Sequence, residues 1–454
     1  MLGFIKNKSM QRMAGGLMRS EGVGISVLAW KELGAPLAAM AMIALCAPAS
    51  AQTIIPSDND TSMMRGFPPA PDKIVTRMNQ LEQPRLHWSL THMRMLLPTA
   101  SIARGSIVSA LPRGPQIEVP SFVDSAGAKY DFGAWMRRTH TDALLVLHDG
   151  EIVFEGYADD VDPSSPHTMQ SATKSVTGVA AAILIDEGKI DPNAPVARYI
   201  PELVHTAWGT ATIQQALDMT TSLQYSEDPK DPNSDLVKHY SVASGTFPPP
   251  PGYGGPRNLY DLLAGIQASG KHGEGFTYKT PNPEVIAWVI ARVTGKRPSE
   301  FVSERLWAKL GTEQDAYVSV DPAGAEMMGG GMSATARDLA RFGEMLRLGG
   351  RYNGQQIVSA AVADEMFKGG DRRKFAKDPL RHDMVGYSYH DFWWVPPTPG
   401  VTEALGAFGQ HIHINRGART VIVKFSAAAI GPGYDEAKRL DPLGFAAIDA
   451  LYAH

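Results

Sequence analysis

The sequence predicts an α+β fold, in which an antiparallel sheet is joined to an all-helical region. Strand patterns lie at 143–157 and again at 386–426, and helical patterns fill much of the stretch between them. A final helical pattern, PLGFAAIDALYA, covers 442–453. This segregation of strands from helices along the chain is typical of α+β folds, whereas parallel α/β folds alternate the two.

The individual elements have clear local signals. Two apolar runs flank Asp149–Gly150, a dipeptide that favours a type I′ hairpin turn. After Ser171, apolar residues recur at helical spacing until Gly188, a residue type that commonly ends helices. Asn282–Pro283 supplies an N-cap residue and a first-turn proline for a helix over EVIAWVIARVTG. The stretch TVIVKFS alternates and is rich in β-branched residues, as strands are.

The composition excludes several classes of protein. The chain has 454 residues, 44% of them apolar and 20% charged, with a formal net charge of −4. Because no clustered run of Lys and Arg occurs, a nucleic-acid partner is not expected. Cys46 is the single cysteine, so neither an internal disulfide nor a zinc site built on several cysteines can form.

The first 51 residues have the pattern of a secretory signal. Arg19 and Lys31 precede a short apolar run at 37–47, and the small residues Ala49 and Ala51 follow it. These are the three parts of a signal peptide, with cleavage expected after Ala51, although an N-terminal core helix would show a similar apolar run. The run is too short to span a bilayer comfortably, so we expect a periplasmic or secreted protein without a stable membrane anchor.

Beyond the signal peptide (1–51), the sequence divides into an N-terminal extension (52–135) and a main body (136–454). The extension is rich in Pro and Ser and has weak periodicity, which indicates a segment wrapped on the body. Within the body, we expect the all-helical subdomain to occupy roughly 190–345, because the helical patterns concentrate there.

The stretch MQSATKSVTG contains Ser171 and Lys174, three residues apart. Residues three apart on a helical turn share a face, so the two side chains can meet. A serine hydroxyl becomes a useful nucleophile when a neighbouring base accepts its proton, and a lysine serves as that base where burial favours the neutral amine. The N–H groups at a helix start can also hold an oxyanion. On spacing alone, a polar helix start is nevertheless the simpler interpretation.

Six regions of the chain carry a family resemblance when they are taken together and in order. They are MRGFPPAP with HWSLTHMRMLLPTASIARG, SATKSVTGVAAAILIDEGKIDPNAPVARYIPEL, ALDMTTSLQYSEDPKDPNSD, FTYKTPNPEVIAWVI, GGGMSATARDLARFGEMLRLGG and GAFGQHIHINRGARTVIVKFS. They resemble the serine hydrolases of the β-lactamase and penicillin-binding-protein fold, and within it the class C-like branch of esterases and 6-aminohexanoate-dimer hydrolases. The resemblance implies a β-lactamase/transpeptidase-like fold and a catalytic role for the Ser–Lys pair.

The resemblance also implies the roles of individual residues. Ser171 resembles the acyl-accepting nucleophile, and Lys174 the group that helps to deprotonate it. Tyr278, in YKTPN, occupies the place of the second-motif tyrosine, which shares the base role and protonates the leaving group. The alternative for Tyr278 is a buried phenol bonded to the backbone. Asn282 resembles a motif residue too, but helix capping explains it fully, so it is left out of the catalytic set.

The third motif departs from that of β-lactamases. GAFGQ, from Gly406 to Gln410, stands where they carry Lys-Thr-Gly. The backbone N–H of Ala407 is therefore the expected second oxyanion donor, joining that of Ser171. The missing lysine would help to grip the carboxylate of penicillins, so its absence argues against an efficient β-lactamase.

Further substrate contacts are expected from Tyr225 in the substrate-covering loop, from Trp394 on the strand before the third motif, and from Gly406 and Gln410. Core packing explains Trp394 equally well. In the covering loop, Pro229 falls where this branch is expected to carry a tyrosine that touches the substrate amide. That difference favours ester hydrolysis over amide hydrolysis.

Taken together, the sequence predicts an exported serine hydrolase that cleaves small linear amides or carboxylic esters through an acyl-enzyme and needs no cofactor. No metal is expected, because His411 and His413 share a strand face without a third ligand nearby. One alternative is a class C-type β-lactamase or D-amino-acid peptidase that acts on cell-wall peptides; another is a non-catalytic, penicillin-binding-like sensor. The expected partner is a small-molecule substrate, and the sequence carries no signal for an oligomeric state.

Overall fold

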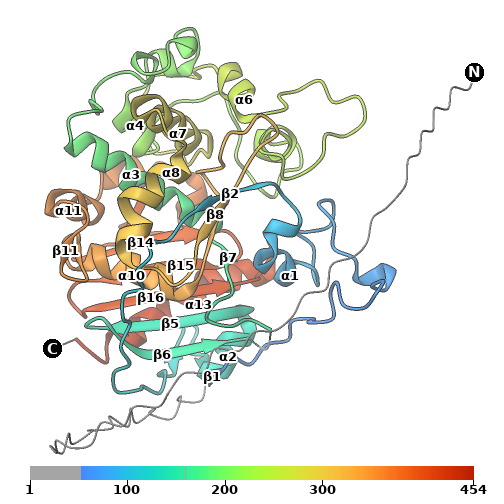
Figure 1. Cartoon of the computed structure of the whole chain (residues 1–454), viewed down its shortest axis with the longest axis vertical. Helices are drawn as coiled ribbons and strands as arrows, with labels where there is room; N and C mark the ends of the chain where they lie inside the picture. The colour runs from blue at the N-terminus through green and yellow to red at the C-terminus, as the bar shows by residue number, and fades with distance from the viewer. Residues whose placement is uncertain (1–52, 159, 454) are drawn as a thin grey trace, which may run out of the picture. The chain divides into compact units, whose positions relative to one another are not determined.

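The computed structural model describes residues 53–158 and 160–453, and the expected signal peptide lies outside these residues. An eight-stranded sheet dominates it, with strand order β1-β6-β5-β16-β15-β14-β13-β12 (Figure 1). Neighbouring strands are antiparallel, except that β1 runs parallel to β6. The predicted α+β class with an antiparallel sheet is thus confirmed. The strands are β1 (Thr53–Ile54), β5 (Thr141–His148), β6 (Glu151–Tyr157), β12 (Ser388–His390), β13 (Trp393–Val395), β14 (Val401–Gly406), β15 (Gln410–Asn415) and β16 (Thr420–Ser426).

The predicted hairpin joins β5 to β6. Asp149 and Gly150 at its tip have φ angles of 48° and 80°. A type I′ turn requires such left-handed values at both central positions, and Asp and Gly adopt them more readily than other residues do. The local sequence therefore determines this turn.

Helices cover both faces of the sheet, and β16 shows the consequence. Val421 and Val423 belong to the larger core, on the face that α10 (Ala336–Arg347) covers, whereas Ile422 packs in a second core with α13 (Pro432–Asp449). Successive side chains of a strand point to opposite faces, so a strand covered on both sides needs apolar residues throughout. Each fully buried Val or Ile stabilises the fold by about 1.5–3 kcal/mol.

The helical region ends earlier than expected. It lies above the sheet in Figure 1 and extends to Leu310. The expected span of 190–345 also includes two strands, β8 (Ala316–Ser319) and β9 (Met332–Ala334), together with α10, which packs mainly on the main sheet. An amphipathic stripe shows that a helix packs against something, but it does not identify the partner. The helices of the region are α3 (Thr173–Asp186), α4 (Ile213–Leu217), α5 (Ser241–Ala243), α6 (Leu259–Gly265), α7 (Pro281–Thr294), α8 (Pro298–Val302) and α9 (Ala308–Leu310).

The helix after Tyr278 begins two residues before the predicted start. The structure begins α7 at Pro281, which leaves Asn282 inside the first turn and not at the N-cap. Its buried amide oxygen accepts a hydrogen bond from the Thr221 hydroxyl at 2.9 Å. The segment TPNP offers two prolines suited to the first helical position. The helix begins at the first of them, Pro281, and in this arrangement Asn282 makes its contact with Thr221.

The N-terminal extension adds strands and short helices to the body. Besides β1, it supplies β2 (Thr99–Ile102) to a second sheet of order β2-β8-β9-β7, whose other strands are β8 (Ala316–Ser319), β9 (Met332–Ala334) and β7 (His167–Thr168). The expected boundary at 135 falls inside α2 (Phe132–Arg138), which packs on α13 and β5. Within the described residues, we find no helix with the length and apolar character that a bilayer crossing would need.

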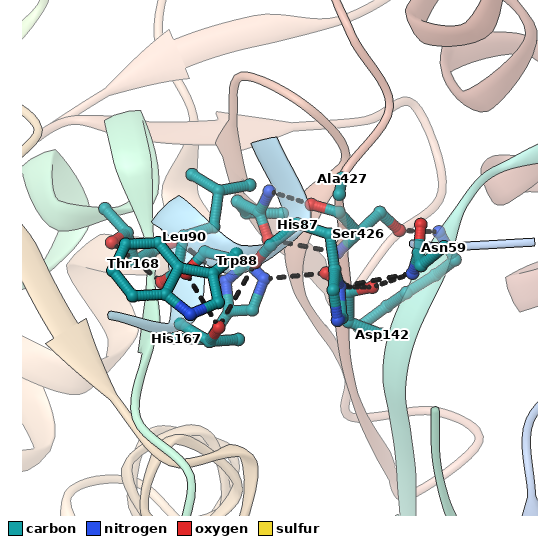
Figure 2. Close-up of polar contacts among 12 residues, drawn as sticks. Asn59, His87, Trp88, Leu90, Asp142, His167, Thr168, Ser426 and Ala427 are labelled. Atoms are coloured by element: carbon teal, nitrogen blue, oxygen red, sulfur yellow. Dashed lines mark hydrogen bonds and ion pairs between the residues drawn. The ribbon is translucent and has the colours of Figure 1, made fainter. Parts of the chain in front are cut away.

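A buried polar cluster connects the extension to the main sheet (Figure 2). Asp142 on β5 is fully buried, and its carboxylate lies 2.8 Å from His87 Nδ1, 3.0 Å from His167 Nε2 and 2.8 Å from Asn59 Nδ2. His87 belongs to α1 (Leu86–Thr91), and its Nε2 lies 2.6 Å from Asp160. Burial opposes a charged ring, but the two carboxylates outweigh it and raise the pKa of His87 to about 10. The cluster is therefore an ion network in the interior.

Candidate active site

The predicted nucleophile lies where a short 3-10 turn, η3 (Gln170–Ala172), leads into α3. Ser171 Oγ is 3.0 Å from Lys174 Nζ, so the two groups predicted from the Ser-x-x-Lys spacing are within hydrogen-bonding distance. Gln170, next to the nucleophile, has a φ of 49°, which is uncommon for a residue other than glycine. Such strain is often found at functional sites, where the surrounding structure holds it in place.

Lys174 is buried, with 1% of its surface exposed. Besides approaching Ser171, its Nζ donates a hydrogen bond to the carbonyl oxygen of Gly329 at 2.6 Å. Within the described residues, no carboxylate oxygen lies within 4.0 Å of this amine. The amine therefore has no direct ion-pair partner there and lies within hydrogen-bonding distance of the Ser171 hydroxyl.

Glu284, which its sequence context does not distinguish, holds Gly329, the residue whose carbonyl contacts Lys174. It lies on α7 with 4% of its surface exposed, and its Oε1 accepts hydrogen bonds from the Tyr240 hydroxyl at 2.6 Å and from the N–H of Gly329 at 3.0 Å. Gly329 is thus held at its N–H by Glu284 while its carbonyl holds Lys174. A Cβ at position 329 would lie 2.6 Å from Glu284 Oε1, so a larger residue there would have to displace this carboxylate. Burial raises the pKa of Glu284 to about 7.

Because the pKa of Glu284 rises from about 4.5 to about 7 on folding, the native state binds one more proton than the unfolded state between these pH values. Stability therefore falls as the pH rises through this window. From pH 5 to pH 8.5, the wild type should lose about 3 kcal/mol more unfolding free energy than Glu284→Gln, which cannot ionise. Urea unfolding of both proteins at several pH values measures this difference, and parallel pH profiles would contradict the prediction.

Tyr278 forms one wall of the site. Its half-buried ring has its centroid 4.9 Å from Lys174 Nζ, and it stacks on Trp394 with centroids 5.4 Å apart and an interplanar angle of 23°. The neighbouring Trp393 instead lies against Phe342 of α10. Strand alternation thus directs Trp394 toward the site and Trp393 into the core. The guanidinium of Arg381 lies beside the two site rings, at 5.4 Å from Tyr278 and 5.5 Å from Trp394.

The end of β14 approaches the nucleophile closely. A Cβ at Gly406 would lie 2.2 Å from the carbonyl oxygen of Met169 and 3.2 Å from the N–H nitrogen of Ala172, so the absence of a side chain permits this approach. Ala407 follows directly, and no described backbone carbonyl accepts its N–H. The structure therefore brings Ala407 into the neighbourhood of Ser171 with a donor available.

The side chain of Gln410 forms hydrogen bonds with the protein backbone. Its Nε2 donates to the carbonyl oxygens of Ala407 at 3.1 Å and Ser426 at 2.7 Å, and its Oε1 accepts from the N–H of Ser426. The expected substrate contact through this side chain is not supported by these bonds. Gln410 instead holds the turn after β14 against β16, and so positions Ala407.

The expected covering loop is hydrogen-bonded to the two residues that follow Tyr278. Lys279 Nζ donates to the carbonyl oxygen of Tyr225 at 2.5 Å, and Glu227 accepts from the N–H of Thr280 at 2.5 Å. Further along, Lys230 pairs with Asp435 on α13 at 3.3 Å, so the loop also contacts the C-terminal helix. The Tyr225 ring is buried and its hydroxyl has no hydrogen-bond partner within the described residues. Tyr225 can therefore contact a substrate, as expected, only if a substrate group reaches this buried position.

The two histidines of β15 contact different acids. His411 Nε2 lies 3.2 Å from Asp441, whereas His413 lies between Glu403 at 2.8 Å and Asp449 at 3.0 Å. Although burial opposes charge, these two carboxylates raise the pKa of His413 to about 10. A protonated imidazole has no lone pair for a metal, so His413 forms an ion bridge between the sheet and α13.

A serine within reach of a buried amine, opposite a strand end whose N–H no described backbone carbonyl accepts, is the arrangement expected of a serine hydrolase. The chain belongs to the beta-lactamase family, whose model, described as "Beta-lactamase", matches residues 124–443.

Two relatives are similar over most of their length. The chain is 35% identical over 347 residues to a 6-aminohexanoate-dimer hydrolase of Paenarthrobacter ureafaciens, covering 76% of this chain and 86% of that protein. A solved structure from Bacillus anthracis, provisionally named a 6-aminohexanoate-dimer hydrolase, is 32% identical with a TM-score of 0.77, covering 85% of this chain and 98% of its own. The predicted family, fold and enzyme class are confirmed.

A more distant likeness concerns the fold alone. EstCE1, a hydrolase with promiscuous acyltransferase activity, superposes with a TM-score of 0.53 at 17% identity, covering 69% of this chain and 94% of that chain.

Proposed function

We propose that this protein is an exported hydrolase that cleaves small linear amides or carboxylic esters through an acyl-enzyme on Ser171. The observation that carries the proposal is the 3.0 Å separation of Ser171 Oγ and the buried Lys174 Nζ, with Tyr278 against the same amine. The relative of Paenarthrobacter ureafaciens, named a 6-aminohexanoate-dimer hydrolase, supports a linear amide as one substrate class. Export rests on the pattern of the first 51 residues.

In the first half of the reaction, Ser171 Oγ attacks the substrate carbonyl carbon while its proton passes to Lys174 or, through it, to Tyr278. The carbonyl oxygen becomes an oxyanion, which the N–H groups of Ser171 and Ala407 stabilise. Tyr278 then gives a proton to the leaving nitrogen or oxygen as its bond to carbon breaks. In the second half, water attacks the acyl-enzyme, a proton returns to Ser171 Oγ, and the carboxylic acid leaves.

The choice between amide and ester depends on the covering loop. Pro229 is exposed and has no N–H or side-chain hydroxyl to offer to a substrate amide. An ester needs no such hydrogen bond, because its leaving oxygen carries no N–H. We therefore propose faster ester hydrolysis than amide hydrolysis.

The test compares hydrolysis rates on a short-chain p-nitrophenyl ester, the linear 6-aminohexanoate dimer and a chromogenic cephalosporin. We expect turnover of the ester, slower turnover of the dimer and little of the cephalosporin. A rapid quench with the ester should add one acyl mass to a peptide containing Ser171. Turnover of the cephalosporin alone would favour the β-lactamase alternative. No turnover of any of the three substrates, and no acyl adduct, would favour a sensor.

A further inference from the structure

Arg381, the last residue of η9 (Pro379–Arg381), places a cation beside the proposed proton donor. Its Cζ lies 5.4 Å from the ring centroid of Tyr278 and 5.5 Å from that of Trp394. Lys174 Nζ lies 4.9 Å from the same Tyr278 ring. The ring is thus bordered by two cations, and only Lys174 is needed for the attack by Ser171. Packing over aromatic rings stabilises a guanidinium but leaves its N–H donors unused.

No carboxylate in the described part of the chain lies within 4.0 Å of Arg381. Within the described residues its guanidinium makes one hydrogen bond, from Nη1 to the carbonyl oxygen of Leu380 at 3.1 Å, and its Nε is shielded from solvent without a partner. Neighbouring arginines are better satisfied, because Arg372 donates to a backbone carbonyl at 2.7 Å and Arg373 pairs with Asp371 at 3.3 Å. A guanidinium has five N–H donors, so Arg381 retains capacity for a further partner.

We propose that Arg381 binds a carboxylate carried by the leaving group of the substrate. The inference rests on the proposed function, in which Tyr278 hands a proton to the leaving atom. The part of the substrate beyond that atom therefore lies on the Tyr278 side of Ser171, where Arg381 stands. A guanidinium grips a carboxylate with two parallel N–H···O bonds. The preferred substrates are then amides and esters whose amine or alcohol product is itself an acid.

This anion site differs from the one that β-lactamases would use. The sequence lacks the third-motif lysine on the strand that faces the nucleophile, where GAFGQ stands instead. Arg381 comes from a separate segment, between α12 (Arg372–Phe375) and β12, and approaches the site from the Tyr278 wall. A carboxylate can thus be recognised on the leaving group although the lysine is missing.

The test uses two esters of nearly equal size, the butanoate ester of 4-hydroxybenzoic acid and that of 4-hydroxybenzamide. The leaving phenol carries a carboxylate in the first and a neutral carboxamide in the second. We expect Arg381→Met to lower kcat/KM about 10- to 100-fold for the carboxylate ester, the range for a charge-assisted hydrogen bond, and to change that of the carboxamide ester less than about threefold. Methionine keeps an apolar stem against Trp394.

Two further variants complete the comparison. Arg381→Lys should recover part of the preference, because it restores the charge without the paired geometry. Arg373→Met removes an equal charge from the same segment and should leave both rates unchanged. Equal losses on both esters in Arg381→Met would overturn the inference and assign Arg381 to supporting the Tyr278 ring. If Arg381→Met still hydrolysed the carboxamide ester, the proposed function would stand. If the wild type hydrolysed neither ester, the inference and the proposed function would both be overturned.

Discussion

Ser171→Ala should lower kcat on the preferred ester by about 10⁴-fold or more, and Lys174→Met by nearly as much. The reason is that an unassisted serine hydroxyl is a weak nucleophile, and in the proposed mechanism the buried amine 3.0 Å away is the base that activates it. Groups that act as one unit are not additive, so the double variant should be scarcely slower than Ser171→Ala alone. Steady-state kinetics on all three variants measure these losses.

Matched controls lie on α3 and just after it. Ser175→Ala removes another serine hydroxyl of α3, which donates to the carbonyl oxygen of Phe392 at 2.7 Å, and it should keep kcat within a few fold. Lys189→Met removes an exposed lysine charge just after α3, where Lys189 pairs with Glu187, and should have no effect on activity. If Lys174→Met kept a tenth of wild-type activity, Lys174 would serve to hold the Gly329 carbonyl and would not be the base.

The parts of the fold that the sequence predicts well are those where local chemistry and burial agree. Asp149 and Gly150 specify the β5–β6 turn by their own backbone preferences. β16 is recognisable because its stretch TVIVKFS is rich in β-branched residues, which suit a buried strand. The span of the helical region was wrong because α10 carries a helical pattern like its neighbours, and only tertiary packing shows that it covers the sheet.

The candidate site likewise contains residues that the sequence predicts and residues that only the structure shows. Ser171 and Lys174 meet because they lie one helical turn apart, and Trp394 faces Tyr278 through strand alternation. Glu284 was missed because an acidic residue near the start of a helix is ordinarily explained by the helix dipole. Its burial against Gly329 depends on a loop 45 residues away in sequence. The available signal was a single acid within the otherwise apolar stretch EVIAWVIA.

Arg381 was missed for a related reason. It lies in DRRKFAKDPLRHD, where alternating charges indicate a solvated surface segment. Nothing in that pattern distinguishes an arginine paired with its neighbour, such as Arg373, from one that the chain path places over two aromatic rings. The distinction requires the three-dimensional position of Tyr278, which comes from a different part of the chain.

Asp142→Asn should destabilise the protein by about 3–5 kcal/mol at pH 7, the usual loss when one partner of a buried ion pair is removed. The carboxylate is fully buried and lies within 3.0 Å of nitrogen atoms of His87, His167 and Asn59. Without it, Asp160 is the one acidic partner that the imidazolium of His87 keeps within the described residues. Urea unfolding at pH 7 measures the loss, and Asp149→Asn, at the exposed tip of the hairpin that β5 begins, is the matched control.

The pH dependence separates this mechanism from a simple packing defect. The pKa of His87 is raised from 6.5 to about 10 in the folded state, so its stabilisation is complete below pH 6.5 and is lost as the pH rises toward 10. Burial opposes ionisation of Asp142, but His87 and His167 hold its pKa below the usual range, so its contribution is lost only in strong acid. Asp142→Asn should therefore lose less stability than the wild type between pH 7 and pH 10. A constant difference across that window would show that the cluster is neutral. In that case His87 would bind the extension through ordinary hydrogen bonds, and the cost of Asp142→Asn would be nearer 1 kcal/mol.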